Sequence, residues 1–193
     1  ARTVSAAVMN VNDMVIRPVL SMTTFVCLFL LPLVTMRLFA EEKKTGTIEL
    51  LMTSPVTDLQ IILGKFAAAV MLYATMLGIT VLHMLVLFRY GYPDWKPMVA
   101  GYLGLFLVGW CFISVGLMFS TITRNQLIAG ILTIIFLLLL WLLGRLNQYS
   151  GSWWGQLGQY VAITTHMENF SKGVIDLKDT IYYLSVIGLG LFF

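Results

Sequence analysis

Long apolar stretches separated by polar segments constrain the fold of this chain more than any other feature. Complete stretches cover residues 19–39, 66–88, 98–122 and 127–143, and a further one begins at 181–193. A helix needs about 20 residues (roughly 17 to 25) to cross the hydrocarbon core of a bilayer. Only helices and closed barrels satisfy their backbone polar groups in lipid. The sequence therefore predicts an all-α polytopic membrane helix bundle, with about five helices in this piece.

The composition agrees with lipid as the main solvent of the chain. Of its 193 residues, 59% are hydrophobic and only 11% are charged, whereas soluble domains are about a quarter charged. The net charge of +3 is dispersed, and no basic run indicates nucleic acid. Cys27 and Cys111 lie in apolar runs far from metal-ligand spacing, so we interpret them as reduced packing residues.

We expect a single transmembrane domain over residues 1–193, with two longer polar segments at 40–65 and 144–180. Ala1–Asn12 lacks the basic start and apolar core of a signal peptide. Because the chain also stops inside the apolar run Leu191–Phe193, we expect it to be an interior piece of a longer subunit.

The stretch Arg37–Lys65 is the most informative polar segment. It holds four of the nine acidic and four of the twelve basic residues, with apolar runs on both sides. The acidic residues are Glu41, Glu42, Glu49 and Asp58, and the basic ones are Arg37, Lys43, Lys44 and Lys65. We hypothesise that a membrane protein binds a water-soluble partner here.

The middle of this stretch predicts a short amphipathic helix held crosswise between two membrane helices. Gly46 can end the preceding helix, and Thr47–Met52 can form the next one. Its apolar side chains Ile48, Leu51 and Met52 fall on one side. Ser54-Pro55 ends it, because a residue before proline is displaced from the α region. The pattern alone leaves two interpretations open, a docking element and a helix that rests on lipid.

Two sequences have the form of a capping box, in which the first and fourth residues cap a helix start reciprocally. Thr57-Asp58-Leu59-Gln60 predicts a helix from about Asp58 that continues through Lys65 into the membrane. Thr165-His166-Met167-Glu168 predicts a short helix that begins there.

Ionisable residues in apolar surroundings are candidate functional residues. His83 is the one strongly polar residue of its apolar stretch, and no acidic residue accompanies it. We favour a hydrogen-bonded or interfacial histidine over a proton relay. His166 and Glu168 lack a third partner at metal-ligand spacing, so a metal site is not favoured.

Small residues follow one another through the third apolar stretch. Gly101, Gly104, Gly109 and Gly116 are the members, and such spacing lets another helix approach closely. No glycine-rich phosphate loop is present around Gly64-Lys65, so we do not expect this chain to bind ATP itself.

The segment MRLFAEEKKTGTIELLMTSPVTDLQIILGK resembles the signature segment of type-2 ABC exporter permeases, and within them the gliding-motility-associated branch. The matching features are Glu41-Glu42, Gly46-Thr47, Glu49-Leu50-Leu51, Thr53-Ser54-Pro55 and Gly64-Lys65. The similarity extends through Pro93-Asp94-Trp95, Thr123–Gln126 and Phe170–Tyr183, and so covers nearly the whole chain.

The resemblance implies a permease subunit, six helices in full, in the bacterial cytoplasmic (inner) membrane. Segment 40–65 would be cytoplasmic, with Thr47–Met52 as a coupling helix that docks on a separate ABC ATPase, and segment 144–180 would be external. ATP and magnesium would be bound by that ATPase, and no cofactor by this chain. A second permease subunit, identical or related, and membrane lipid would be the other partners. The residues expected at the ATPase interface are Glu41, Glu42, Gly46, Thr47, Ile48, Glu49, Leu51, Met52, Ser54 and Pro55.

The function expected from these features is that of a permease, not an enzyme, in an ATP-driven transporter that exports its substrate. The alternatives are a non-transporting membrane anchor of an ATPase complex and a proton-coupled secondary transporter. The positive-inside rule does not decide the orientation, because five basic residues on one side oppose seven on the other.

Overall fold

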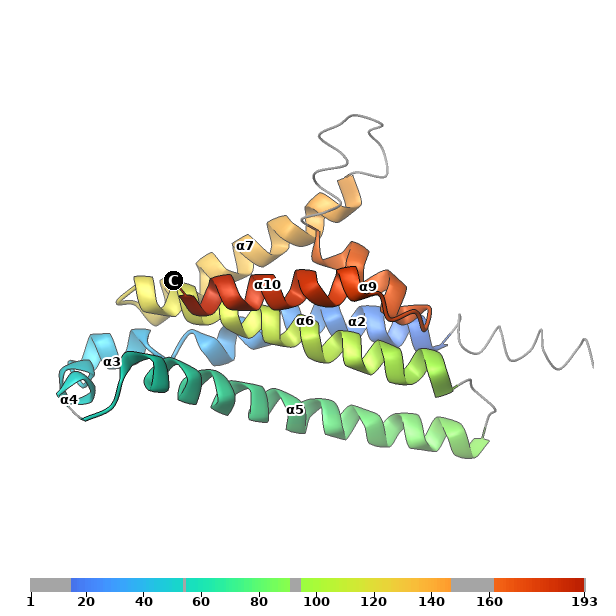
Figure 1. Cartoon of the computed structure of the whole chain (residues 1–193), viewed down its shortest axis with the longest axis horizontal. Helices are drawn as coiled ribbons and strands as arrows, with labels where there is room; N and C mark the ends of the chain where they lie inside the picture. The colour runs from blue at the N-terminus through green and yellow to red at the C-terminus, as the bar shows by residue number, and fades with distance from the viewer. Residues whose placement is uncertain (1–14, 54, 91–94, 147–161, 193) are drawn as a thin grey trace, which may run out of the picture.

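The structure is a computed structural model that describes residues 15–53, 55–90, 95–146 and 162–192. The described residues form helices joined by turns, with no strand among them (Figure 1). In chain order the helices are α2 (Arg17–Thr35), α3 (Ala40–Thr45), α4 (Ile48–Met52), α5 (Asp58–Tyr90), α6 (Trp95–Ile122), α7 (Gln126–Leu146), α9 (Ile163–Ser171) and α10 (Leu177–Phe192). The predicted all-α fold class is confirmed.

Four of the described helices are long and apolar enough to cross a membrane. They are α5, α6, α7 and the stretch from α2 through α3. The α10 helix, with 16 residues in the described chain, runs beside α6. The chain is therefore a multi-pass membrane protein.

Helix α6 is the centre of the bundle, because α2, α5, α7, α9 and α10 all pack against it. Its glycines make this packing possible, as their spacing predicts. Side chains of α2, α5 and α9 occupy the space where a Cβ atom would stand. The pairs are Leu20 on Gly101, Phe170 on Gly104, Tyr73 on Gly109 and Thr35 on Gly116.

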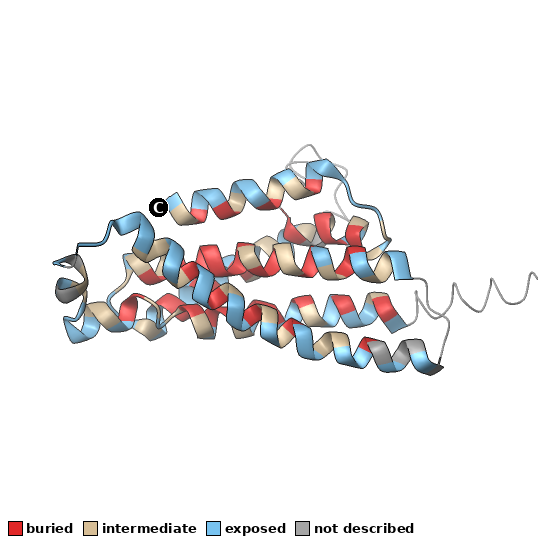
Figure 2. Cartoon of the chain, turned by 60° about the horizontal axis from the view of Figure 1, so that its bottom comes forward, coloured by how far each residue is buried: buried red, intermediate tan, exposed pale blue. Residues whose placement is uncertain are grey.

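Helices α5 and α7 contribute much less of their surface to the bundle. Figure 2 shows α5 in front of the core with most of its surface exposed. Large apolar side chains such as Met71, Ile79 and Leu139 are more than half exposed. In a protein whose solvent is lipid, this apolar surface is compatible with contact to acyl chains.

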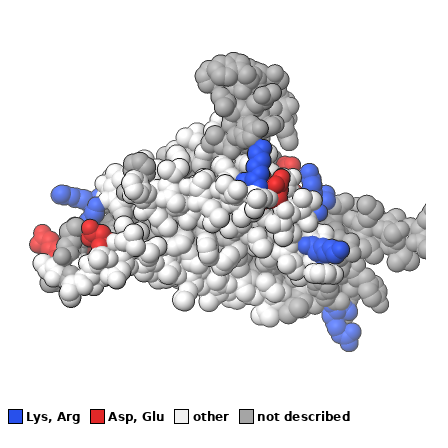
Figure 3. All heavy atoms as spheres, in the orientation of Figure 1, with Lys and Arg blue, Asp and Glu red and all other residues white. Residues whose placement is uncertain are grey.

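The two ends of the bundle differ from its middle in charge (Figure 3). Lys, Arg, Asp and Glu gather toward the ends, with other residues between them. The end that carries α3, α4, the start of α5 and the last turn of α6 is called the α4 end below. The end that carries α9, the start of α2 and the first turn of α10 is called the α9 end.

Helix α2 stops earlier than the sequence indicates. The apolar stretch 19–39 predicts a membrane helix that reaches residue 39, but α2 ends at Thr35 and turns occupy residues 36–39 before α3 begins. Pro32 lies inside α2, four residues before Met36. The break is the first element of the site described next.

Candidate functional site

The chain between α2 and α5 consists of two short helices at the α4 end. Gly46 separates them and has a φ of 76°, a left-handed conformation in which a side chain would be strained. The predicted helix break at Gly46 is therefore present. One short turn of helix, Ile48–Met52, follows Thr47. The predicted short helix between two membrane helices is thus observed.

Buried Ser120, in the last turn of α6, closes the break between α2 and α3. Its Oγ accepts hydrogen bonds from the backbone N–H groups of Phe39 and Ala40, each with an N···O distance of 3.1 Å. It also donates to the carbonyl oxygen of Met36 at 3.2 Å. These three bonds use the one donor and both acceptor sites of a serine hydroxyl. A single side chain of α6 thus replaces bonds that an unbroken helix would have made itself.

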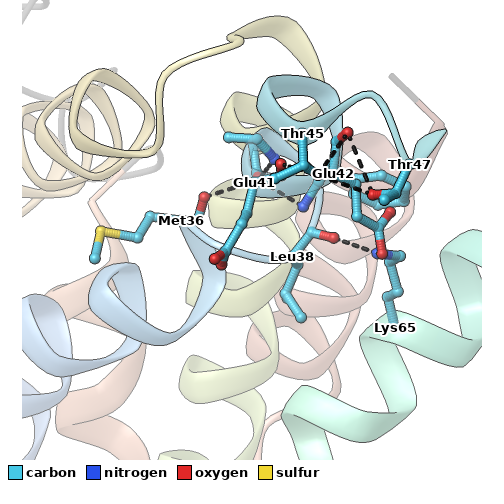
Figure 4. A network of polar contacts seen from close by, with 10 residues as sticks. Met36, Leu38, Glu41, Glu42, Thr45, Thr47 and Lys65 are labelled. Carbon is cyan, nitrogen blue, oxygen red and sulfur yellow. Dashed lines mark hydrogen bonds and ion pairs between the residues drawn. The ribbon is translucent and has the colours of Figure 1, made fainter.

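Lys65, near the start of α5, contacts the same break from another side. Its Nζ lies 2.6 Å from Glu42 Oε1 and donates a hydrogen bond to the Leu38 carbonyl oxygen. It also lies 4.4 Å from the centroid of the Phe39 ring, a cation–π distance. Figure 4 shows Lys65 pointing from α5 toward Leu38 and Glu42.

A third contact adds to the connection with α6. Lys43 Nζ donates to the carbonyl oxygen of Thr121, the residue after Ser120. The α3 helix is therefore bonded to the end of α6 by its own first turn and by a lysine side chain. Through Glu42 it is paired with α5.

The other predicted interface residues lie around this network. Glu41 and Glu49 are exposed in the first turns of α3 and α4, where an acidic side chain favours the helix dipole. The Thr47 hydroxyl lies 3.0 Å from that of Thr45. Ile48 and Leu51 are half-buried.

The remaining members of the predicted set are described only in part. Pro55 is exposed. Met52 ends α4, but its side chain lies outside the described part of the structure, and Ser54 lies outside the described residues altogether.

The two predicted capping boxes have different outcomes. The backbone N–H of Thr57 donates to Gln60 Oε1 at 3.1 Å, and α5 begins at Asp58, as predicted. The short helix predicted near Thr165 is present, but Thr165 neither begins nor caps it. Helix α9 begins at Ile163, after Ala162, without a side-chain cap. The Tyr183 hydroxyl of α10 donates to the Ile163 carbonyl oxygen at 3.0 Å, so a contact between helices holds this first turn.

A second polar cluster, at the α9 end, is buried. His166 Nδ1 lies 2.6 Å from Asp179 Oδ1, and Asn169 Nδ2 donates to Asp179 Oδ2 at 2.8 Å. The His166 ring stacks on Tyr182 with centroids 4.1 Å apart. His166 pairs with Asp179 of α10, whereas Glu168 is exposed and lies 4.0 Å from Lys172. The cluster therefore fastens α9 to the start of α10.

A cavity of about 380 Å³ lies on the other side of α9. Residues of α2, α7 and α9 line it, with hydroxyl groups, an indole and two opposite charges in its wall. The lining residues are Arg17, Leu20, Ser21, Thr24, Trp141, Gly144, Thr165, Met167, Glu168 and Ser171.

His83 takes no part in either cluster among the described contacts. It is exposed on α5, and its Nδ1 lies 3.2 Å from the carbonyl oxygen of Ile79, one turn earlier in the same helix. This is the hydrogen-bonded histidine that the sequence favours.

Three residues of these clusters were missed at the level of sequence. Ser120 was not singled out there, and Lys65 was named as a basic residue and as part of the Gly64-Lys65 pair, without a role in this network. Asp179 was not singled out. The i, i+3 spacing of His166 and Asn169 places both on one face of α9 and is the one local signal for that cluster.

Comparison with known families agrees with the described architecture. A family model described as ABC-2 family transporter protein matches residues 2–150. No curated protein and no solved structure matches the chain. Proteins of this kind are membrane transport components that generally act with an ABC ATPase and typically have no nucleotide site of their own. The matched region covers most of the chain, so the chain belongs to the ABC-2 family and is a permease component of an ABC transporter.

Proposed function

We propose that this chain is the permease subunit of an ATP-driven exporter, and that its α3–α4 segment docks on a separate ABC ATPase. In this proposal the α4 end faces the cytoplasm and the α9 end faces the outside. ATP and magnesium bind to the ATPase, and a second permease subunit, identical or related, completes the path through the bacterial cytoplasmic membrane. The resemblance to gliding-motility-associated permeases belongs to the same proposal.

The observation that carries the proposal is the bonding of a short exposed segment to three membrane helices at once. The α3 helix follows α2, pairs with α5 through Glu42–Lys65, and bonds to α6 through Ser120. A loop that only rested on lipid would not need these contacts. A loop that receives a force does need them, because the force must reach the helices that line the path.

The exposed side chains of the segment suit a protein partner. Ile48 and Leu51 keep part of their apolar surface accessible, and apolar surface at the centre of an interface supplies most of its binding free energy. Glu41 and Glu49 are exposed beside them and can face basic groups of the ATPase. Gly46 and Pro55 set the directions in which the chain enters and leaves α4.

The test replaces the apolar side chains of α4 with charges. The double variant Ile48→Asp, Leu51→Asp should no longer co-purify with the ATPase subunit in mild detergent, while the permease remains folded. The matched control is Val174→Asp, Ile175→Asp, which charges two exposed apolar residues at the α9 end. Undiminished co-purification of the α4 variant would contradict the proposal.

The alternatives give different results in a transport assay. An ATP-driven exporter is inhibited by vanadate, whereas a proton-coupled transporter loses activity with the proton gradient. A non-transporting anchor shows ATPase activity that no substrate changes. The described contacts of His83, an exposed residue bonded to its own helix, do not favour the proton-coupled alternative.

A further inference from the structure

We infer that Ser120 is a positioning residue that transmits movement of the α3–α4 segment to helix α6. The inference rests on the proposed function, because the movement is assumed to begin at a bound ATPase. It assigns to one buried hydroxyl the connection between the docking segment and the centre of the bundle.

The hydroxyl lies where the chain cannot supply its own bonds. Phe39 and Ala40 are the N-cap and first residue of α3, and backbone N–H groups at a helix start have no partner within the helix. Ser120 accepts both and donates to Met36, which follows the last residue of α2. One side chain of α6 therefore holds the end of α2 and the start of α3 together.

Burial makes this connection stiff. Ser120 is 0% exposed, and Phe39 and Ala40 are also buried. Water therefore has little access to this site and would not replace a hydrogen bond that Ser120 loses. A buried polar group that loses its partner costs about 1 to 3 kcal/mol. A displaced α3 should therefore carry the end of α6 with it instead of separating from it.

The packing one turn away explains why so short a side chain can reach. At Gly116, four residues before Ser120, the Thr35 side chain fills the space of the missing Cβ. This close approach brings the end of α2 against α6. Lys43 adds a bond to the carbonyl oxygen of Thr121, so two successive residues of α6 are bonded to α3.

The contact with α5 is of a different kind. The Lys65 and Glu42 side chains retain 17% and 32% of their exposure, and an ion pair that water can reach contributes little free energy. We therefore assign the transmission to α6 and treat the pair with α5 as a contact that can open. Because α6 packs against α2, α5, α7, α9 and α10, its displacement would reach the whole bundle.

The chain offers a matched control for the test. Ser114 lies in the same helix and is also 0% exposed, but its hydroxyl donates only within α6, to the Cys111 carbonyl oxygen at 2.9 Å. Ser120→Ala and Ser114→Ala thus remove the same atom from equally buried sites of one helix. The two variants differ in whether the lost bonds cross between helices.

The first measurement follows hydrogen exchange in the purified permease–ATPase complex, reconstituted in lipid nanodiscs. Ser120→Ala should speed exchange of the Phe39 and Ala40 amides about tenfold or more, because their acceptor is gone. Ser114→Ala should leave both amides as they are in the wild type. Equal exchange in the two variants would overturn the inference.

The second measurement asks whether ATP still moves α6. Fluorophores on genetically encoded amino acids at Leu82 of α5 and Val99 of α6, both exposed, report the separation of these helices without disturbing the native cysteines. ATP should change the separation in the wild type and Ser114→Ala. In Ser120→Ala the ATP-dependent change in separation should fall to less than about a third of the wild-type change. Ser114→Ala removes an equally buried hydroxyl, so a loss seen only in Ser120→Ala is not an effect of burial alone.

The outcomes separate this inference from the proposed function. If the wild type does not co-purify with an ATPase, both fail. If it does, and ATP moves α6 equally in Ser120→Ala, only the role of Ser120 is wrong. Should Ser120→Ala not assemble, Ser120→Cys, whose thiol forms weaker hydrogen bonds, is read in the same way.

Discussion

The two ends of the bundle each hold a polar cluster, but the clusters are built differently. At the α4 end, the Lys65–Glu42 pair keeps 17% and 32% of its side-chain exposure, and the backbone is broken on either side of α3. At the α9 end, the His166 and Asp179 side chains keep only 7% and 4% of their exposure, and Asn169 donates a hydrogen bond to the second carboxylate oxygen of Asp179. Water can compete for the first cluster and has little access to the second.

This difference teaches how a small membrane protein can combine a fixed part with a movable one. A buried and fully bonded cluster is costly to disturb, so α9 and α10 should move as a unit. An accessible pair beside two helix breaks can open and close at little cost. Within the α4 end itself, the buried bonds of Ser120 are the exception, and they point toward α6.

Removal of the carboxylate at the α9 end should have the largest effect on stability. Asp179→Ala leaves His166 and Asn169 without their shared acceptor, and the free energy of unfolding should fall by about 3 kcal/mol. Thermal unfolding in detergent measures the change. Glu168→Ala, which removes an exposed carboxylate 4.0 Å from Lys172 at the same end, should shift it little, and equal shifts would show that the buried cluster is not what holds this end.

Overpacking of the α9 end should come next. A Cβ atom on Gly104 would lie 2.7 Å from Phe170 Cβ, so Gly104→Ala should cost about 1 to 3 kcal/mol. Gly64→Ala, at the α4 end, meets nothing within 4 Å and should be neutral or slightly stabilising. A larger loss of thermal stability in Gly64→Ala than in Gly104→Ala would contradict the assignment of the α9 end as the tightly packed one.

A backbone change at the α4 end should act locally. Gly46→Ala forces a side chain into the left-handed region, at a cost of about 1 to 2 kcal/mol. We expect weaker binding of the ATPase by about tenfold, with little change in thermal unfolding of the bundle. Thr45→Ala, the preceding residue, is the control. A drop in bundle stability as large as that of Asp179→Ala would mean that the segment is not separable from the core.

The smallest effect on stability is expected at the half-buried ion pair of Lys65 and Glu42. Glu42→Gln removes the charge opposite Lys65, and the free energy of unfolding should change by no more than about 1 kcal/mol. Chemical or thermal unfolding compared with the wild type measures this. A loss above about 2 kcal/mol would place the pair in the same class as the buried cluster and erase the difference between the ends.

The sequence predicts those features of the fold that depend on residues close together in the chain. The lengths of the apolar stretches predict the membrane helices, Gly46 predicts the break, and Thr57 and Gln60 predict the start of α5. These features follow from local rules of length and capping.

The contacts that define the two clusters are not local. Ser120 and Phe39 are 81 residues apart in the sequence, and no pattern near either residue predicts the hydrogen bond between them. The start predicted for α9 at Thr165 was wrong for the same reason. Tyr183 of α10 bonds to the Ile163 carbonyl oxygen, fixes the first turn there and overrides the capping signal at Thr165. Such pairings become visible only when the helices are placed against one another.

The central claim is that the α4 end is the face that meets the ATPase, and site-specific photo-crosslinking in cells tests it most directly. A photoreactive amino acid at Thr53, exposed just after α4, should crosslink to the ATPase subunit. The same residue at Ile175, exposed at the α9 end, should not. Crosslinks to the ATPase from Ile175 and none from Thr53 would contradict the account.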